Sequence, residues 1–308
     1  MTMASQQPFF QHANPQGNRL VVYTAIYGNY DVLREPPAPL PGCDFVCFTD
    51  NPQLRSEHFD IVLSPAPSTD PSRQSRHFKI LPHRLFPNHE YSLWLDASID
   101  LKTDQLLKMA DDLLRYHDIA LFRHGSRDCI YDEMEACIAF GKDDEAIMQR
   151  QIEKYRQENF PAHLGLASSG VMFRRHNATA CIRLCEAWWQ EICAHSRRDQ
   201  LSFIYACWKT KTPYGVIPGG VRQNEFFLVN DHQPELRPDT AAELQVRLDQ
   251  QSEELKTLTA RLAAIELSDG FRLLGNYYAW RDRLLPLGSW RRQLAKRVFR
   301  RFRAAPEN

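Results

Sequence analysis

The sequence predicts an α/β fold in which helices cover a largely parallel β-sheet, followed by a separate helical tail. Short runs of apolar and β-branched residues alternate with stretches of helical periodicity, as is typical of such sheets. The first run, 20–26, has no polar alternation, which indicates a strand buried on both faces. Residues 239–266 contain neither Gly nor Pro and repeat apolar residues at helical spacing, which sets the tail apart.

The composition is that of a soluble protein with a core. Of the 308 residues, 43% are hydrophobic and 25% are charged. This hydrophobic fraction is large enough for the chain to form a buried core. No run approaches the roughly 18–20 apolar residues of a membrane-spanning helix, and residues 1–19 include no apolar signal segment. The eight cysteines form no C-x-x-C pair, which excludes a zinc ribbon or a dithiol redox motif. We therefore expect a cytoplasmic protein with reduced thiols.

The predicted elements follow one another in a regular order. Strands are expected at 20–26, 44–49, 59–63, 91–96, 119–122 and 168–173. Helices are expected at 75–85, 103–116, within 129–158, at 179–193 and at 199–208. The last of these opens with an acidic residue, which suits the positive end of the helix dipole. Gly219-Gly220 breaks the pattern, and the compact domain is predicted to end near Pro238.

Four segments are predicted: a flexible leader (1–18), the α/β domain (19–238), a short coiled coil (239–268) and a basic amphipathic tail (269–308). Apolar residues from Leu244 to Ile265 recur at alternating spacings of four and three, with Gln251 as one polar position, and this pattern is a heptad seam. A single amphipathic helix packed on the body is the alternative. The coiled coil predicts a homo-oligomer, most simply a parallel dimer.

The formal net charge of zero hides an asymmetry between body and tail. Residues 271–308 carry ten basic and two acidic side chains, a net charge of +8, so the rest of the chain carries −8. Large apolar residues interleave with these cations, which favours a helix lying on an anionic membrane surface. Nucleic acid is the competing partner for so many arginines, but the acidic body disfavours it. We expect a protein held peripherally on the inner face of the membrane.

A carboxylate ends the predicted strand 91–96, within the segment Trp94-Leu95-Asp96-Ala97-Ser98. Open α/β sheets bind their ligands at the carboxyl ends of the strands. Asp96 and Ser98 are therefore candidates to hold Mg²⁺ or Mn²⁺ against nucleotide phosphates. The alternative is an ordinary turn, because Asp and Ser often cap chain reversals.

The loop after the first strand is a second candidate. Thr24 and Ala25 are small enough for backbone amides to approach a nucleotide, and Tyr27 or Tyr30 offers a ring that stacks on a base. An ordinary β-to-α turn is the alternative here.

Two cations on one predicted helix are a third candidate. Arg76 and Lys79 lie three residues apart, so they share a helix face and are able to meet the same phosphate. A solvated basic face is the alternative.

Several polar side chains are candidates to bind a sugar or an acceptor. His124 and Asp128 follow the predicted strand 119–122, and Ser168 and Ser169 open the strand near 168. Asp199 and Gln200 would present a carboxylate and a carboxamide to a polyol. His232 is a candidate metal ligand, although a lone histidine is more often structural.

Taken in order, these segments carry a family resemblance. The strings that match are VVYTAIYGNYD (21–31), FVCFTDN (45–51), RHFKILPH (76–83), YSLWLDASI (91–99), LFRH (121–124), SSGVMFRRHN (168–177), WWQEI (188–192), SRRDQLSF (196–203) and DH (231–232). Their order is more specific than any single string. From 19 to 232 the chain resembles the glycosyltransferase-like domain family once catalogued only as a domain of unknown function. Plant members of that family are linked to mucilage polysaccharide and, in one case, to ceramidase activity.

The resemblance implies a GT-A-like, Rossmann-like sheet that binds a nucleotide, similar to that of retaining family 8 glycosyltransferases. In those enzymes a D-x-D motif and a later His hold Mn²⁺ against the donor diphosphate. Here the motif reads Asp96-Ala97-Ser98, so Ser98 replaces the second carboxylate, and His232 stands near the position of the late His.

We therefore expect a hexosyltransferase-like enzyme, retaining by analogy, that acts in surface polysaccharide or glycan synthesis. It would move a sugar from a nucleotide-sugar donor to a saccharide or lipid-linked acceptor. Asp96 would anchor the donor phosphates through a metal, Mn²⁺ or Mg²⁺, or through water, while Arg76 and Lys79 neutralise the charge on the departing diphosphate. Asp199 and Gln200 would face the reacting sugar as the catalytic pair.

Two alternatives are kept. A lipid amidohydrolase of the ceramidase type is disfavoured because no H-x-H or H-x-x-x-H spacing, typical of metal hydrolases, occurs. A non-catalytic carbohydrate-binding or scaffold protein would have kept the fold and lost the metal site, and Ser98 in place of a carboxylate is the feature that supports it.

Overall fold

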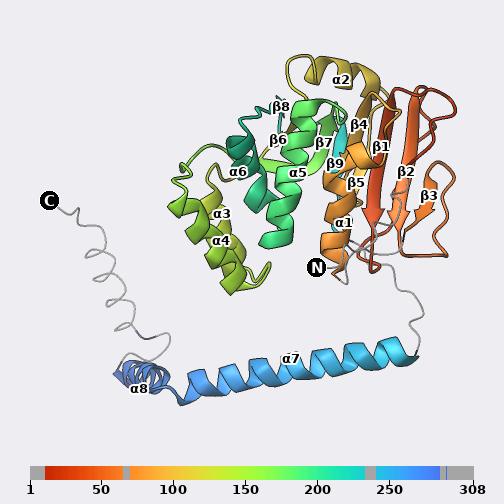
Figure 1. Cartoon of the computed structure of the whole chain (residues 1–308). Coiled ribbons are helices and arrows are strands. Elements are labelled where there is room, and N and C mark those ends of the chain that lie inside the picture. The colour runs from red at the N-terminus through yellow and green to blue at the C-terminus, as the bar shows by residue number, and fades with distance from the viewer. Residues whose placement is uncertain (1–10, 65–69, 233–240, 285–288, 290–308) are drawn as a thin grey trace, which may run out of the picture. The chain divides into compact units, whose positions relative to one another are not determined.

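A seven-stranded mixed β-sheet forms the centre of the first of two units, 1–236 and 237–308. The structure is a computed structural model, and it describes residues 11–64, 70–232, 241–284 and 289. The strands of the sheet are β1 (Leu20–Ile26), β2 (Cys43–Thr49), β3 (Asp60–Leu63), β4 (Tyr91–Leu95), β6 (Ile119–Arg123), β7 (Ala167–Arg174) and β8 (Gly215–Ile217). They lie in the order β3-β2-β1-β4-β7-β6-β8 (Figure 1). The predicted α/β class is therefore confirmed.

One strand, β7, runs against the others. It pairs antiparallel with both β4 and β6, whereas the pairs β1–β2, β1–β4, β2–β3 and β6–β8 are parallel. Because β7 is antiparallel to β6, the end of β6 and the start of β7 lie at the same edge of the sheet. The long helical segment between them therefore begins and ends at that edge. As a result, the first residues of β7 lie at the edge where β4 ends.

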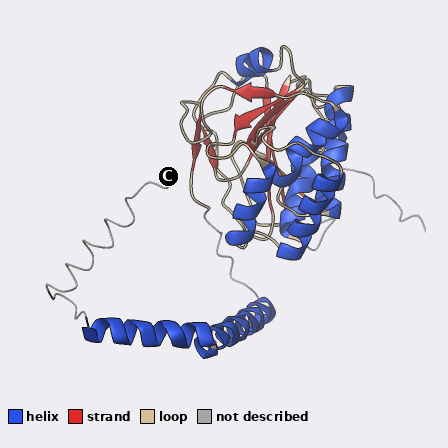
Figure 2. Cartoon of the chain, turned by 90° about the vertical axis from the view of Figure 1, so that its left-hand side faces the viewer, coloured by secondary structure: helices blue, strands red, loops and turns tan. Residues whose placement is uncertain are grey.

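Residues of β1 alternate between two apolar cores, as the unbroken apolar run predicts. Val21 and Tyr23 belong to the core under α1 (Pro71–Ile80), α5 (Thr179–Ala194) and α6 (Gln200–Thr210). Leu20 and Val22 belong to a second core that includes α2 (Leu106–Leu113). Figure 2 shows most helices gathered on one side of the strands. Both faces of the sheet are thus covered.

Three short strands were not predicted. Besides β8 in the main sheet, β5 (Ile99–Leu101) and β9 (Phe227–Val229) form a separate two-stranded antiparallel sheet. Its residues Ile99, Leu101 and Phe227 are buried in the second core. Because β5 begins directly after the loop 96–98 and β9 precedes 230–232, this small sheet brings those two loops together.

Helix ends follow local chemistry. The Asp70 side chain caps α1 and accepts a bond from the Ser72 amide. This helix ends at Ile80, and a 3₁₀ turn over Pro82–Arg84 replaces the predicted continuation to 85, because Pro82 has no amide hydrogen to donate. The remaining helices of this unit are α3 (Ile130–Ala139) and α4 (Glu145–Gln157). Asp199 caps α6 through the Gln200 amide, which confirms the predicted acidic opening.

Residues 11–18, the described part of the segment predicted as a flexible leader, contact the sheet. The His12 amide donates to the Leu85 carbonyl (2.8 Å), and the Asn14 side chain donates to the Asn88 carbonyl (3.0 Å). The Asn18 side-chain amide donates to Asp44 Oδ1 at 2.5 Å. These bonds fasten the segment at the amino ends of the parallel strands.

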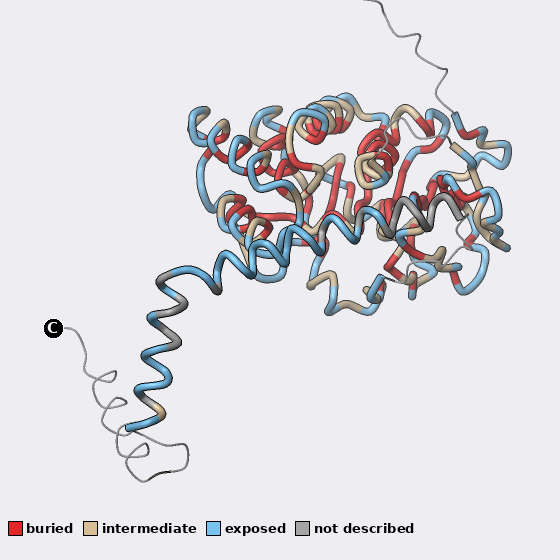
Figure 3. Tube along the Cα trace, turned by 90° about the horizontal axis from the view of Figure 1, so that it is seen from below, coloured by how far each residue is buried: buried red, intermediate tan, exposed pale blue. Residues whose placement is uncertain are grey.

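The second unit contains two helices, α7 (Ala241–Leu267) and α8 (Asp269–Leu284). The described heptad residues Leu255, Leu258, Leu262 and Ile265 are all exposed in the single chain (Figure 3). The coiled coil, the dimer and the cytoplasmic location stay predictions, and most of the basic tail lies outside the described residues. None of the described helices combines the length and apolar character that crossing a bilayer requires.

Candidate functional site

Asp96 follows β4 directly and is held in place on several sides. Its amide donates to the Gly170 carbonyl (2.8 Å), and its Oδ1 accepts bonds from Trp94 Nε1 (2.7 Å) and Lys79 Nζ (3.1 Å). A Cβ on Gly170 would stand 3.1 Å from Asp96 Oδ2. Because Gly170 has no side chain, there is room for the Asp96 carboxylate. The bonds from Trp94 and Lys79 fix the orientation of that carboxylate.

A buried ion-pair cluster lies behind Asp96. Lys79 Nζ stands 2.6 Å from Asp199 Oδ2 and 3.2 Å from Ser169 Oγ, and it lies over the Trp94 ring. Ser169 Oγ in turn donates to Asp199 Oδ2 (2.9 Å). The Lys79 side chain is 1% exposed. We call Lys79, Asp96, Ser169 and Asp199 the lysine cluster; it joins α1, β4, β7 and the start of α6.

Asp199 stays ionised within this cluster. Burial alone would raise its pKa, but the positive charges of Lys79 and Arg76 outweigh that effect, so the pKa is well below its usual range. Arg76 Nε lies 3.9 Å from Asp199 Oδ2. Gln200, at the first turn of α6, accepts a bond from Arg198 through its side chain (3.1 Å). Arg76, Lys79 and Asp199 thus lie together, and their predicted roles at the diphosphate and the reacting sugar stay predictions.

A pocket opens on the other side of Asp96. Its enclosed volume is about 20 Å³, and apolar side chains of β1, β2, β4, β5 and neighbouring loops line most of it. The polar residues of its lining are Thr24, Arg34 and Asp96. Among the described residues, Thr24 Oγ1 and Arg34 Nε and Nη2 are buried without a hydrogen-bond partner. These unsatisfied polar groups make the small pocket a candidate contact point for a ligand, not a cavity that encloses one. Arg34 was not predicted, because it lies in a loop without periodicity or motif.

The two candidate tyrosines of the loop after β1 lie in different environments. Tyr27 is 2% exposed and its ring stacks on Phe78, so it belongs to the core. Tyr30 is 63% exposed and lies against the His232 ring, with ring centroids 4.7 Å apart. Tyr30 is therefore the tyrosine with a face open to a ligand. Ala25, at the end of β1, is buried.

His232 is tied to the same loop and to the loop after β4. Its Nδ1 lies 2.7 Å from Asp31 Oδ2, and Asp31 is buried. Asn230 donates through both its amide and its side chain to the Ser98 carbonyl (2.8 and 3.2 Å). A carboxylate that orients one ring nitrogen leaves the other for a ligand, as in many metal-binding histidines.

The structure does not assemble the predicted metal ligands into a complete set. Among the described residues, the groups of three His, Cys or acidic side chains close enough to hold one ion are His12, Asp44 and His89, and Cys129, Asp132 and His163. Neither contains Asp96 or His232. An ion at Asp96 would therefore depend on donor phosphates for most of its ligands.

Three other predicted residues lie apart from the lysine cluster. His124 is half-buried beside Glu133 (3.9 Å), and Asp128 pairs with His163 on the surface (2.9 Å). Ser168 stands on β7, paired across to Phe122 of β6. No hydrogen bond or ion pair joins these residues to Asp96 within the described part of the chain, and their role in acceptor binding stays a prediction.

Replacing Asp199 with Asn tests the lysine cluster. The change leaves a buried ammonium short of one counter-charge, so the free energy of unfolding at pH 7 should fall by about 3–5 kcal/mol. A carboxylate with a lowered folded pKa stabilises above its unfolded pKa, about 3.9, and this contribution is lost as pH falls through the folded pKa. The difference between wild type and Asp199→Asn, measured by urea unfolding, should therefore shrink below about pH 4.

The control for this test is Asp128→Asn, which removes a carboxylate from an exposed pair and should change stability little at either pH. Lys79→Met combined with Asp199→Asn should recover part of the loss. A constant difference between wild type and Asp199→Asn from pH 7 to pH 3 would contradict the ion pair.

Comparisons with known proteins now add to this geometry. A family model described as "TOD1/MUCI70, glycosyltransferase-like domain" matches residues 59–225. The Arabidopsis thaliana protein "Probable hexosyltransferase MUCI70" is 31% identical over 152 residues, which cover 46% of this chain and 26% of that protein. "Alkaline ceramidase TOD1" from the same plant is 26% identical over 223 residues, 60% of this chain and 47% of that protein. The chain thus spans less than half the length of either relative.

Two solved structures show a weaker likeness. The apo structure of the bifunctional glycosyltransferase WbbM matches with a TM-score of 0.40 and 12% identity, covering 68% of this chain and 40% of that one. Mouse xyloside xylosyltransferase 1 matches with a TM-score of 0.38 and 14% identity, covering 65% and 84%. These scores are too low to assign a shared fold. The family model, by contrast, covers more than half of the residues, and the chain therefore belongs to the TOD1/MUCI70 glycosyltransferase-like domain family.

Proposed function

We propose that this chain is a glycosyltransferase of the GT-A type that binds a nucleotide-sugar donor at the carboxyl edge of its sheet. It transfers the sugar, a hexose by analogy with its relative, to a saccharide or lipid-linked acceptor. The observation that carries the proposal is the position of Asp96, held between the pocket with Thr24 and Arg34 and the lysine cluster. Family membership supports the same reaction class.

The bonds to Asp96 leave one oxygen for the donor. Both hydrogen bonds that the described residues make to this carboxylate go to Oδ1, and the side chain is 39% exposed. Oδ2, which lies beside Gly170, is therefore the oxygen left to bind an ion. Mn²⁺ or Mg²⁺ bound there would neutralise the diphosphate, and such ions usually take one or two carboxylates and complete their shell with phosphate and water.

The side-chain cations near Asp96 leave little positive charge for the donor diphosphate, which favours a bound metal ion. Lys79 already faces two carboxylates, Asp96 and Asp199, so it has little charge left to offer a diphosphate. Arg34 and Arg76 are the nearby cations, and Arg34 contacts Asp100 only at 3.6 Å. In the reaction, the bond from the anomeric carbon to the diphosphate breaks with its electron pair on the leaving oxygen. The oxygen of the acceptor hydroxyl bonds to that carbon, and its proton passes to the departing diphosphate.

We assign Asp199 a positioning role. Its carboxylate is buried and holds the Lys79 ammonium against Asp96, while its neighbour Gln200 begins α6. Tyr30 offers its exposed ring to the nucleobase. Retention of configuration is part of the proposal by analogy alone.

Asp96→Asn should weaken donor binding without unfolding the protein. The neutral amide keeps the shape but loses the charge that binds the ion, so affinity should fall at least about tenfold, or about 1.4 kcal/mol. Titration calorimetry against a panel of nucleotide-sugars measures it, with Arg34→Met as a second variant in the pocket wall. Asp104→Asn, an exposed carboxylate outside the pocket, is the matched control. Equal affinity of Asp96→Asn and wild type for every donor bound would remove Asp96 from the site. The alternative lipid amidohydrolase function is tested separately: a short-chain N-acyl sphingosine is added to the protein, and hydrolysis of its amide bond is measured.

Added Mn²⁺ or Mg²⁺ should raise the affinity for the same donors, and His232→Ala should reduce that gain. The physical reason is that Asp31 holds His232 Nδ1, which leaves Nε2 for an ion. The measurement is donor affinity with and without chelator, for wild type and variant. Full transfer activity in excess chelator would mean that Arg34 and Arg76 supply the electrostatic role instead.

We further propose that the second unit dimerises and anchors the enzyme at an anionic membrane. The exposed leucines of α7 support pairing, and each cation near such a surface contributes about 1 kcal/mol. Deleting 271–308 should abolish sedimentation with anionic vesicles at low salt. If the wild type bound neutral vesicles as strongly as anionic ones, the proposal that the charges of the tail hold the protein at the membrane would be contradicted.

A further inference from the structure

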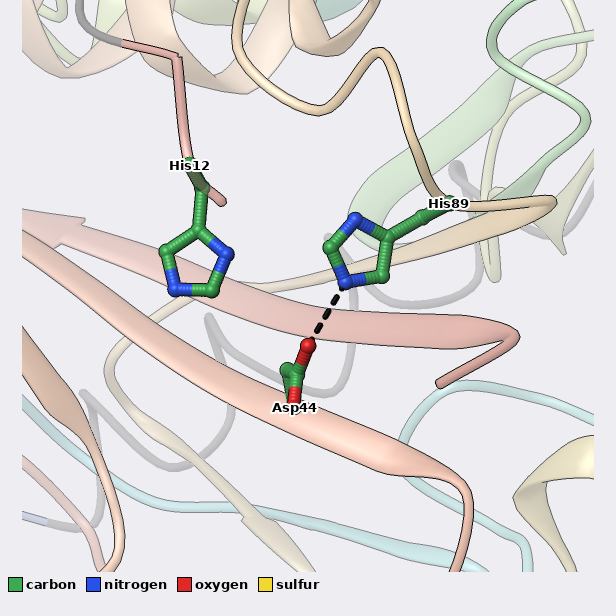
Figure 4. A group of neighbouring side chains, drawn as sticks. All are labelled: His12, Asp44 and His89. Carbon is green, nitrogen blue, oxygen red and sulfur yellow. Dashed lines mark hydrogen bonds and ion pairs between the residues drawn. The ribbon is translucent and has the colours of Figure 1, made fainter. Parts of the chain in front are cut away.

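Two histidines and an aspartate converge at the amino edge of the sheet, away from Asp96. They are His12, Asp44 at the start of β2, and His89 just before β4 (Figure 4). His89 Nε2 lies 2.8 Å from Asp44 Oδ2, and the rings of His12 and His89 have centroids 5.8 Å apart. Figure 4 shows the two imidazoles facing each other with the carboxylate beside them.

The donor atoms of these residues suit one ion. One ligand atom from each residue lies within 4.8 Å of the others. A tetrahedral Zn²⁺ with bonds of about 2.0–2.2 Å places neighbouring ligand atoms roughly 3.3 Å apart. One observed separation is 2.8 Å and the others are at most 4.8 Å. Small side-chain movements would bring the ligand atoms to the tetrahedral spacing.

The ring of His89 is buried beside the candidate site. It is 2% exposed, and its Nε2 is the nitrogen that faces Asp44. Its Nδ1 is buried without a hydrogen-bond partner among the described residues.

The surroundings provide a further ligand and an entry path. Asp60 Oδ2 lies 3.2 Å from His12 Nε2 and is largely exposed. A pocket lined by residues 11–13 and 15–16, together with Asp44 and Asp60, opens beside the cluster. An ion reaches the cluster from solvent through this pocket.

We propose that His12, Asp44 and His89 bind one Zn²⁺ ion, with Asp60 or water as fourth ligand, and that the ion fastens residues 11–16 to the sheet. Two imidazoles with a carboxylate favour Zn²⁺ over Mg²⁺ or Ca²⁺, which prefer oxygen ligands alone. Asp44 is level with Val21, whereas Asp96 follows the pair Tyr23–Trp94 by two residues. The site is therefore roughly 13 Å along the strands from Asp96, and its role is structural.

The test uses the full chain, stripped with chelator and re-equilibrated with Zn²⁺. We expect one Zn²⁺ per chain by elemental analysis, and Co²⁺ in its place should give the visible absorption of a tetrahedral site. Zn²⁺ at about 100 times its Kd should raise the Tm by roughly 5–10 °C and slow proteolysis within 11–16. His12→Gln and Asp44→Asn should each abolish binding and the rise in Tm.

Matched variants separate this site from others. His83→Gln removes a histidine that bonds only one carboxylate, Glu186 (2.8 Å), within the described residues and should keep the ion. His163→Gln disables the other candidate group, and Asp96→Asn disables the proposed donor site. Zinc retained by His12→Gln but lost from His163→Gln, or no zinc bound by wild type, would overturn the proposal. His12 lies on the leader segment outside the strands and helices, so His12→Gln can be read even if His89→Gln does not fold.

Discussion

One buried ammonium group organises the carboxyl edge of the sheet. Lys79 lies on the last turn of α1 with its side chain 1% exposed, so its charge requires partners inside the protein. Asp96 and Asp199 supply them, and Ser169 supplies an oxygen between the two. Each partner comes from a different element. The pairing therefore fixes where α1, β7 and the start of α6 stand relative to the end of β4, and it fixes the one carboxylate that faces both the cluster and the pocket.

The reversed direction of β7 is what makes this arrangement possible. Ser169 and Gly170 lie near the beginning of β7, and because this strand is antiparallel to β4, its beginning meets the end of β4. Ser169 then reaches Lys79, while Gly170 has no side chain to displace Asp96. A parallel strand at this place would bring the other end of its sequence to the edge. The antiparallel direction of β7 is thus what allows Ser169 to reach Lys79 and Gly170 to leave room for Asp96.

Much of the fold could be predicted from sequence, because the long strands and helices carry local patterns. The run 20–26 and the acidic opening of α6 are examples that the structure confirms. The three-residue strands β5 and β9 have no such pattern, since what stabilises them is a pairing across more than a hundred residues. The spacing of Arg76 and Lys79 predicted a shared helix face, but not that Lys79 would be buried. Arg34 escaped prediction for a similar reason: besides the neighbouring β1 and β2, its surroundings are made by β4 and β5, about 60 residues away in sequence.

The loop 96–98, which resembles a D-x-D motif with Ser98 at its third position, is joined to a distant segment through its backbone. The Ser98 carbonyl, which any residue would have, accepts both bonds from Asn230 and so connects the loop after β4 to the segment that ends in His232. Through Asp31 and Tyr30 that segment also meets the loop after β1. The carboxylate of Asp31 pairs with His232 at 2.7 Å. The segment that ends in His232 is therefore joined to the loops after β1 and β4 by contacts that only the folded chain provides.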